Sequence, residues 1–180
     1  MLFRSAGQII RRLRDFVEHR EVTRAVEDPN KVVEEAMALG LIDIAHSDVK
    51  VHFDFDQSAP AIYIDKIQIQ QVLVNLMRNA IEAMQGVARR ELHVRVERGA
   101  ADSTTISVCD TGLGLDRAVA ERLFQPFVTT KKTGMGVGLS ICQSIVEAHH
   151  GRIWAAPNDG PGVTFHVNLP AAATIAPAES

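Results

Sequence analysis

The chain has 180 residues, 46% hydrophobic and 23% charged, which is typical of a soluble globular protein with one core of about 100–150 residues. Its net charge of −3 and pI near 6.2 provide no basic field, which argues against nucleic acid as a partner. No apolar run approaches the ~18 residues of a membrane span, and the N-terminus has no signal-peptide pattern. We therefore expect a cytoplasmic chain without direct membrane contact, with any membrane anchor in sequence outside it.

The N-terminal segment, residues 6–20, carries apolar side chains at helical spacing among several arginines. This pattern predicts a helix whose apolar stripe needs a partner. After a polar stretch, Asp28-Pro29 has the residues typical of a helix N-terminus. We therefore expect a boundary near residue 22, with a short N-terminal helix over 1–22 and a main domain over 28–170.

The main domain alternates between helical and strand periodicities. Helices are predicted over 29–41, 65–84 and 136–149, the last ended by Gly151 in the left-handed C′ position. Strands are predicted over 49–55, 61–64, 91–99, 104–110, 151–157 and 162–169, with a lid-like stretch over 111–133. Because strict βαβ alternation is missing, the order predicts an α+β fold: a two-layer sandwich of one mixed sheet with helices on one face. The Ala/Pro-rich end, 171–180, is predicted to be a disordered tail.

Two glycine clusters, DTGLG at 110–114 and GMGVG at 134–138, frame the lid-like stretch. Neither lies in a GxxxxGK[ST] motif or in a GxGxxG turn between a strand and a helix. Glycine is used where backbone must turn or lie directly against a ligand. We interpret the two clusters as two walls of one site.

Two asparagines lie beside the apolar stripe of the predicted helix over 65–84. Asn75 and Asn79 are one turn apart, next to the stripe formed by Ile69, Leu73, Leu76 and Ala80. At the border of the core such amides can face a pocket. Two surface amides are an equally good interpretation of the helix alone.

Asp110 ends the strand TTISVCD on the same face as Ile106 and Val108, which is the apolar face. A carboxylate directed inward must find hydrogen-bond donors. Gly112 leaves room for a ligand to supply them, whereas an aspartate that only caps the turn is the alternative.

The loop before the second glycine cluster offers Thr129, Thr130, Lys131 and Lys132. Exposed N–H groups at a helix N-terminus bind phosphate, and a lysine can add charge, although a solvated loop explains each lysine equally well. Cys109 and Cys142 lie in apolar segments and are predicted to be reduced thiols. The seven histidines show no ligand spacing with cysteines or carboxylates, so the sequence predicts no zinc site.

In order along the chain, NLMRNA, DTGLGL, LFQPF, TGMGVGLSI and PGVTFHVNLP resemble the N, G1, F, G2 and final glycine motifs of the catalytic domains of sensor histidine kinases, in the GHKL ATPase superfamily. AGQIIRRLRDFV and QIQQVLVNLMRNAIEAM are similar to the oxygen-responsive FixL type. The resemblance covers about 28–170. It implies a Bergerat-type ATP-binding fold and a protein-histidine kinase that uses ATP and Mg²⁺.

The resemblance also implies residue roles. Asn75 and Asn79 would be catalytic, with the Asn79 amide oxygen binding Mg²⁺, and Asp110 would accept a hydrogen bond from the adenine amino group. Because relatives that hydrolyse ATP carry a glutamate at the position of Asn75, an amide there favours transfer to a protein side chain. The ATP-binding residues would be Asn79, Asp110, Gly112, Gly114, Thr129, Thr130, Lys131, Gly134, Gly136, Val137, Gly138, Leu139 and Thr164. Glu82 occupies a place where many relatives have a basic residue, so Arg78 or Lys131 would contact the phosphates.

None of the histidines is followed by Glu or Asp, as the phosphoacceptor of sensor kinases is. By the resemblance, residues 1–22 would be the end of the second helix of a dimerisation hairpin that carries the acceptor. The partners implied are that hairpin, in a homodimer, and then a response regulator. A stand-alone GHKL-type ATPase and a nucleotide-binding interaction module are the alternatives.

Overall fold

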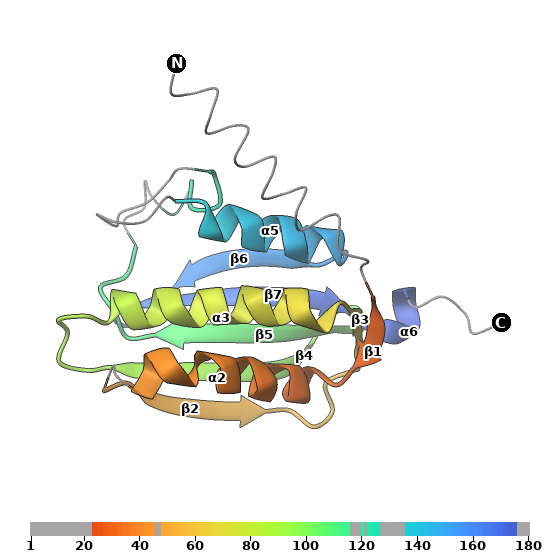
Figure 1. Cartoon of the computed structure of the whole chain (residues 1–180), viewed down its shortest axis with the longest axis horizontal. Helices are drawn as coiled ribbons and strands as arrows, with labels where there is room; N and C mark the ends of the chain where they lie inside the picture. The colour runs from red at the N-terminus through yellow and green to blue at the C-terminus, as the bar shows by residue number, and fades with distance from the viewer. Residues whose placement is uncertain (1–22, 46–47, 116–119, 121, 127–135, 176–180) are drawn as a thin grey trace, which may run out of the picture.

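A mixed sheet of five strands, in the order β2-β4-β5-β7-β6, forms one layer of the computed structural model, and helices α2, α3 and α5 form the other (Figure 1). The structure describes residues 23–45, 48–115, 120, 122–126 and 136–175. Strands β2 and β4 are parallel, and the other neighbours in this sheet are antiparallel. The predicted α+β sandwich with helices on one face is thus confirmed.

The elements follow the predicted order. The strands are β1 (Ala25–Glu27), β2 (Lys50–Phe55), β3 (Ile62–Ile64), β4 (Glu91–Gly99), β5 (Ser103–Asp110), β6 (Arg152–Pro157) and β7 (Val163–Pro170). The helices are α2 (Pro29–Ala45), α3 (Lys66–Ala83), α5 (Gly138–Ala148) and α6 (Ala172–Ile175).

The core lies between α3 and the sheet. The predicted stripe of α3 is buried, with Ile69 and Leu76 0% exposed and Leu73 and Ala80 1% exposed. At the start of the helix, the Asp65 side chain accepts a hydrogen bond from the Gln68 N–H at 3.2 Å. The opposite half of the core comes from alternate residues of the central strands: Leu92, Val94, Val96, Ile106, Val108, Phe165 and Val167. This packing fixes the orientation of α3, and with it the positions of Asn75 and Asn79.

Two short elements were not predicted. Strand β1 pairs antiparallel with β3 in a separate two-stranded sheet. Helix α6 occupies the start of the segment assigned to a disordered tail, because the Ala171 N–H donates to the Asp102 carbonyl at 2.8 Å and the Ala172 N–H to the Ala61 carbonyl at 2.7 Å. These bonds and the burial of both alanines hold residues 171–175 against the domain.

The end of α5 also differs from the prediction. His150, with φ of +58°, adopts the left-handed conformation that we assigned to Gly151. Gly151 is needed for a different reason, since a Cβ there would lie 2.5 Å from the Asn168 carbonyl oxygen. The chain therefore turns one residue earlier and passes directly over β7.

The predicted N-terminal helix over 1–22 and the last residues, 176–180, lie outside the described residues. Within the described ranges, none of the helices is both long and apolar enough to cross a membrane.

Candidate functional site

Asp110 ends β5 with its side chain directed toward the helix layer, as the period of two predicted, and it is 2% exposed. Its Oδ1 accepts a hydrogen bond from the Gly112 N–H at 2.8 Å. Burial raises the pKa of this carboxyl group, and hydrogen bonds from the backbone of Gly112 and Val163 oppose the rise. The two interpretations of Asp110 are therefore compatible: it caps the turn and also faces inward.

Backbone surrounds this carboxylate closely. A Cβ on Gly112 would lie 2.5 Å from the Ala83 carbonyl oxygen of α3, and a Cβ on Gly162 would overlap the Asp110 carbonyl oxygen. Gly162 has φ of +96° and Gly114 has φ of +79°, in the region that favours glycine. These glycines leave a flat wall of peptide groups around the end of β5.

Asn158, in the β6–β7 hairpin, supports this wall of peptide groups through hydrogen bonds to the backbone. Its Nδ2 donates to the Asp110 carbonyl at 2.8 Å and to the Pro161 carbonyl at 3.1 Å. Its Oδ1 accepts from the Thr164 hydroxyl at 2.6 Å. Neither Asn158 nor Gly162 was singled out from the sequence, although PGVTF was recognised as a glycine motif and Gly162 lies within it.

The structure does not bring Thr164 to the Asp110 side of the sheet. Val163 and Phe165 are 5% and 6% exposed and face the core, so the residue between them faces the opposite side. Thr164 instead pairs in register with Cys109 and bonds to Asn158. Of the two neighbours, Val163 is the one whose backbone reaches the Asp110 carboxylate.

Asn75 connects α3 to α5. Its Nδ2 donates to the Cys142 Sγ at 3.2 Å, and a Cβ on Gly138 would lie 3.1 Å from its Oδ1. Burial raises the pKa of the Cys142 thiol to about 12, so this sulfur remains protonated at neutral pH. Cys142 and Cys109 are both free thiols, as predicted. Asn79 is half-buried one turn further along α3.

The second glycine cluster leads into α5. Gly136 has φ of +66°, and Val137, the N-cap, provides no side-chain hydrogen bond to the first turn. The first N–H groups of α5 are thus not capped by that side chain, which is the arrangement that receives phosphate oxygens at a helix N-terminus. Gly138 and Leu139 begin the helix, both partly buried. Thr129, Thr130, Lys131 and Gly134 lie outside the described residues.

The described site therefore joins three elements on the helix side of the sheet. The end of β5 supplies a buried acceptor, α3 supplies two amides, and the start of α5 supplies backbone N–H groups beside Asn75. Such an arrangement can hold a planar group that donates a hydrogen bond at one end and an anionic group at the other. Asn79 is the predicted metal ligand within it, because an amide oxygen is a hard donor that suits Mg²⁺.

Comparisons with known proteins agree with this geometry. Residues 64–173 match the family described as histidine kinase-, DNA gyrase B-, and HSP90-like ATPase. Sensor protein FixL of Bradyrhizobium diazoefficiens is 53% identical over 167 residues, which are 93% of this chain and 33% of that protein. The chain thus spans about a third of the length of this curated relative.

Solved structures of a histidine kinase also match this chain. The catalytic domain of histidine kinase ThkA is 32% identical, with a TM-score of 0.71 over 84% of this chain and 96% of that one. ThkA in complex with response regulator protein TrrA is 26% identical, with a TM-score of 0.72 over 93% of this chain and 48% of that one.

Proposed function

The chain belongs to the histidine kinase-, DNA gyrase B- and HSP90-like ATPase family, and we propose that it is the ATP-binding catalytic domain of a two-component sensor histidine kinase. In this role it binds Mg-ATP and transfers the γ-phosphoryl group to a histidine on a dimerisation hairpin. A response regulator then receives the phosphoryl group. The kinase names of the relatives, including one solved with a response regulator, support this assignment within the family.

The observation that carries the proposal is the buried Asp110 carboxylate at the end of β5. A carboxylate that accepts only backbone N–H bonds retains lone pairs for a further donor, and the adenine amino group is such a donor. Gly112 and Gly162 bring backbone, without side chains, up to the same carboxylate. Adenine can therefore lie flat against peptide groups while Asp110 selects it by its amino group.

The phosphates extend from this end of the site toward α5. The N–H groups at the start of α5 lie at the positive end of the helix dipole, where negatively charged phosphates are stabilised. Asn79 would hold Mg²⁺ through its amide oxygen, with phosphates and water completing the shell. When bound, this ion neutralises charge on the phosphates and so makes transfer easier.

The side chain of Asn75 favours transfer of the phosphoryl group over hydrolysis of ATP. An amide does not accept a proton at neutral pH, so it cannot activate water as a general base. Its bond to the Cys142 thiol and its contact with Gly138 instead position the start of α5 relative to α3. The chain's contribution to transfer is then positioning and charge stabilisation, with the attacking nitrogen supplied by the hairpin histidine.

A reconstituted transfer assay tests the function. The purified chain, incubated with γ-labelled Mg-ATP and a supplied dimerisation hairpin, is expected to label the hairpin and not itself. The label should be acid-labile and base-stable, as phosphohistidine is. Steady release of inorganic phosphate without labelling of the hairpin would indicate a stand-alone ATPase, and ATP binding with neither reaction would indicate a nucleotide-binding module. Label on this chain alone would also contradict the proposal.

The Mg²⁺ role has its own test. Asn79→Ala is expected to weaken Mg-ATP binding by at least about tenfold, with the fold retained because the residue lies beside the buried stripe and not in it. Gln71→Ala, on an exposed position of the same helix, is the matched control and should bind like the parent. Calorimetry with and without Mg²⁺ measures both. Parent-like Mg-ATP binding by Asn79→Ala would remove this residue from the metal site.

A further inference from the structure

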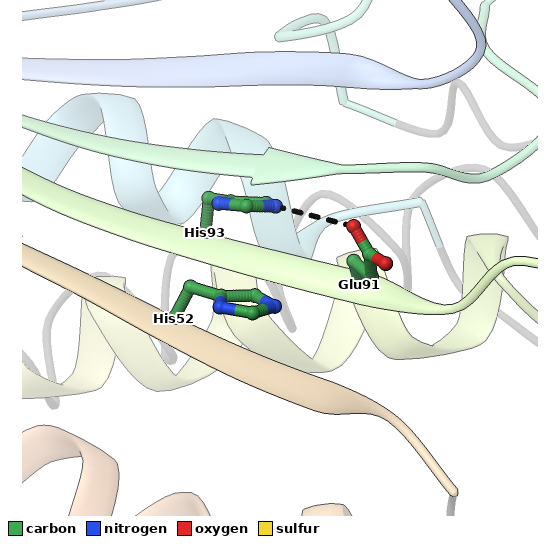
Figure 2. A group of neighbouring side chains, drawn as sticks. All are labelled: His52, Glu91 and His93. Atoms are coloured by element: carbon green, nitrogen blue, oxygen red, sulfur yellow. Dashed lines mark ion pairs between the residues drawn. The ribbon is translucent and has the colours of Figure 1, made fainter.

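A group of three side chains that the nucleotide site does not use lies on the open face of the sheet. In the parallel pair of β2 and β4, His52 is the register partner of His93, so the two imidazoles project side by side. Glu91 precedes His93 by two residues and therefore shares its face. Leu92 and Val94, which alternate with these residues, are 0% and 1% exposed on the helix side. The group thus lies on the side opposite the helices (Figure 2).

Their geometry brings three potential ligand atoms together. The two imidazole rings are stacked, with centroids 4.5 Å apart and an interplanar angle of 14°. The Glu91 Oε2 lies 3.6 Å from the His93 Nε2, and Figure 2 shows the carboxylate beside the stacked rings. One ligand atom from each residue lies within 4.8 Å of the other two.

We propose that His52, Glu91 and His93 form a binding site for a divalent transition-metal ion, with Zn²⁺ as the best fit. Two imidazoles and one carboxylate are a frequent three-ligand set for Zn²⁺, which leaves the fourth position to water or to a ligand from another molecule. Imidazole nitrogens favour Zn²⁺, Ni²⁺ and Cu²⁺ over Mg²⁺ and Ca²⁺, which prefer all-oxygen sites. The site is therefore chemically distinct from the Mg²⁺ of the nucleotide.

Small side-chain movements close the site around an ion. With Zn–N distances of about 2.0–2.1 Å, tetrahedral ligand atoms lie about 3.3 Å apart, so the present spacing, which is within 4.8 Å, must shorten by up to about 1.5 Å. The backbone need not move, because the strand pairing already places the two histidines opposite each other. The His93 side chain is 47% exposed and His52 is also exposed, so both rings have room to rotate.

Nearby charges decide how tightly the ion is held. The Arg89 Nη2 lies 2.6 Å from the Glu91 Oε2 and competes for this carboxylate, but its side chain is 66% exposed. Exposed ion pairs of this kind contribute little, so Zn²⁺ can displace the guanidinium. Lys50 and Arg95 also lie on this face, and Arg95 is already paired with the Asp54 carboxylate at 3.0 Å. Removal of Arg89 should therefore strengthen binding of the ion.

Titration of the metal-free chain with Zn²⁺ against a chromophoric chelator tests the site. One equivalent is expected to bind, and His52→Gln and His93→Gln should each weaken binding by at least about tenfold. Arg89→Ala should tighten it. The matched control is His150→Asn, which removes an exposed imidazole outside the group and places at φ of +58° a residue that tolerates this conformation. It should bind like the parent.

A second measurement needs no variant. In the unaltered chain, one equivalent of Zn²⁺ should shift the imidazole ¹⁵N resonances of two histidines that show a mutual ring contact. Absence of these shifts would overturn the proposal. So would parent-like Zn²⁺ binding in folded His52→Gln and His93→Gln, or equal weakening in His150→Asn.

Discussion

On the helix side of the sheet, the Asp110 carboxylate is 2% exposed and accepts a backbone N–H at 2.8 Å, whereas on the open face Glu91 is held by the side chain of an exposed arginine. Asp110 and Glu91 belong to the neighbouring strands β5 and β4, and Thr111 connects the two. The Thr111 hydroxyl, directly after Asp110, accepts the Glu91 N–H at 3.0 Å and donates to the Arg89 carbonyl at 2.8 Å. The two proposed sites therefore differ in how the protein holds their ligand groups: by backbone at Asp110, and by an exposed side chain at Glu91.

On the helix side of the sheet, the covered side, the binding groups are held in place by the backbone before any ligand binds. Peptide N–H groups and glycines do not rotate away, so the Asp110 acceptor is preorganised. Groups on the open face are oriented by exposed side chains, which suits an ion that draws its ligands together. The free energy of unfolding should therefore depend more on substitutions that disturb the covered side than on substitutions of the open face, and the following predictions begin with the covered side.

The largest expected effect is at Gly162. A Cβ there would overlap the Asp110 carbonyl oxygen, and its φ of +96° is strained for any other residue. Gly162→Ala is expected to lower the free energy of unfolding by more than about 3 kcal/mol, since it combines a backbone clash with strain. Denaturant unfolding followed by circular dichroism measures the change.

Gly160→Ala is the matched control in the same hairpin. A Cβ there has nothing within 4 Å, so the variant should be within about 0.5 kcal/mol of the parent. Equal stability of Gly162→Ala and Gly160→Ala would show that the end of β5 is not rigid, and the comparison of the two faces would fail.

The periodicity within single elements predicted the main features of the covered side of the sheet. The buried stripe of α3 and the inward direction of Asp110 both follow from neighbours within one element, with periods of 3.6 and 2. The same period of two in VTFHVNL places Thr164 outward, between the buried Val163 and Phe165. The family resemblance had suggested Thr164 for the adenine site, and the local pattern was the better guide to its direction.

What the sequence could not reveal depends on pairing between distant segments. His52 and His93 are neighbours only because β2 and β4 pair in parallel, and no spacing along one strand records that register. The β1–β3 pairing involves three residues on each side, too few for a periodic signal. Likewise, the hydrogen bonds that hold residues 171–175 come from Asp102 and Ala61, far away in the chain.

A second prediction tests the proposed role of Asp110 as the acceptor that selects the nucleotide base. Guanine presents a carbonyl oxygen where adenine presents its amino group, so GTP would oppose two acceptors. Loss of one charge-assisted hydrogen bond costs roughly 1.5–3 kcal/mol, and ~1.4 kcal/mol corresponds to a factor of ten. The parent should therefore prefer ATP over GTP by at least about tenfold, as measured by displacement of a fluorescent nucleotide.

Asp110→Asn tests the residue behind this preference. The amide keeps the size of the carboxylate but offers a donor on one side, so ATP binding should weaken and the difference between ATP and GTP should narrow. Equal displacement by ATP and GTP in the parent would leave Asp110 as a turn cap alone.

The smallest predicted effect concerns a buried histidine of the covered side, in contrast to the exposed pair on the open face. His149 is 1% exposed; its Nε2 accepts the Asp65 N–H at 3.0 Å, and its Nδ1 lies 2.7 Å from the Ile145 carbonyl. These bonds require the neutral ring. Burial is the main cause that lowers the pKa of His149, and Arg24 and His150 lower it further while Ile145 and Asp65 oppose them.

Because the folded pKa of His149 is depressed, its contribution to stability is fully present above the unfolded pKa near 6.5 and is lost as pH falls toward the folded value. The free energy of unfolding should therefore decrease from pH 7.5 to 5.5, by at most about 1.4 kcal/mol per pH unit for one proton. His149→Gln retains an acceptor for the Asp65 N–H without titrating, so its slope should be shallower. His150→Asn removes one of the neighbours that lower the pKa of His149, so it should make the slope shallower by less than His149→Gln does. If His149→Gln and His150→Asn both follow the parent profile, protonation of the buried ring does not control stability in this range.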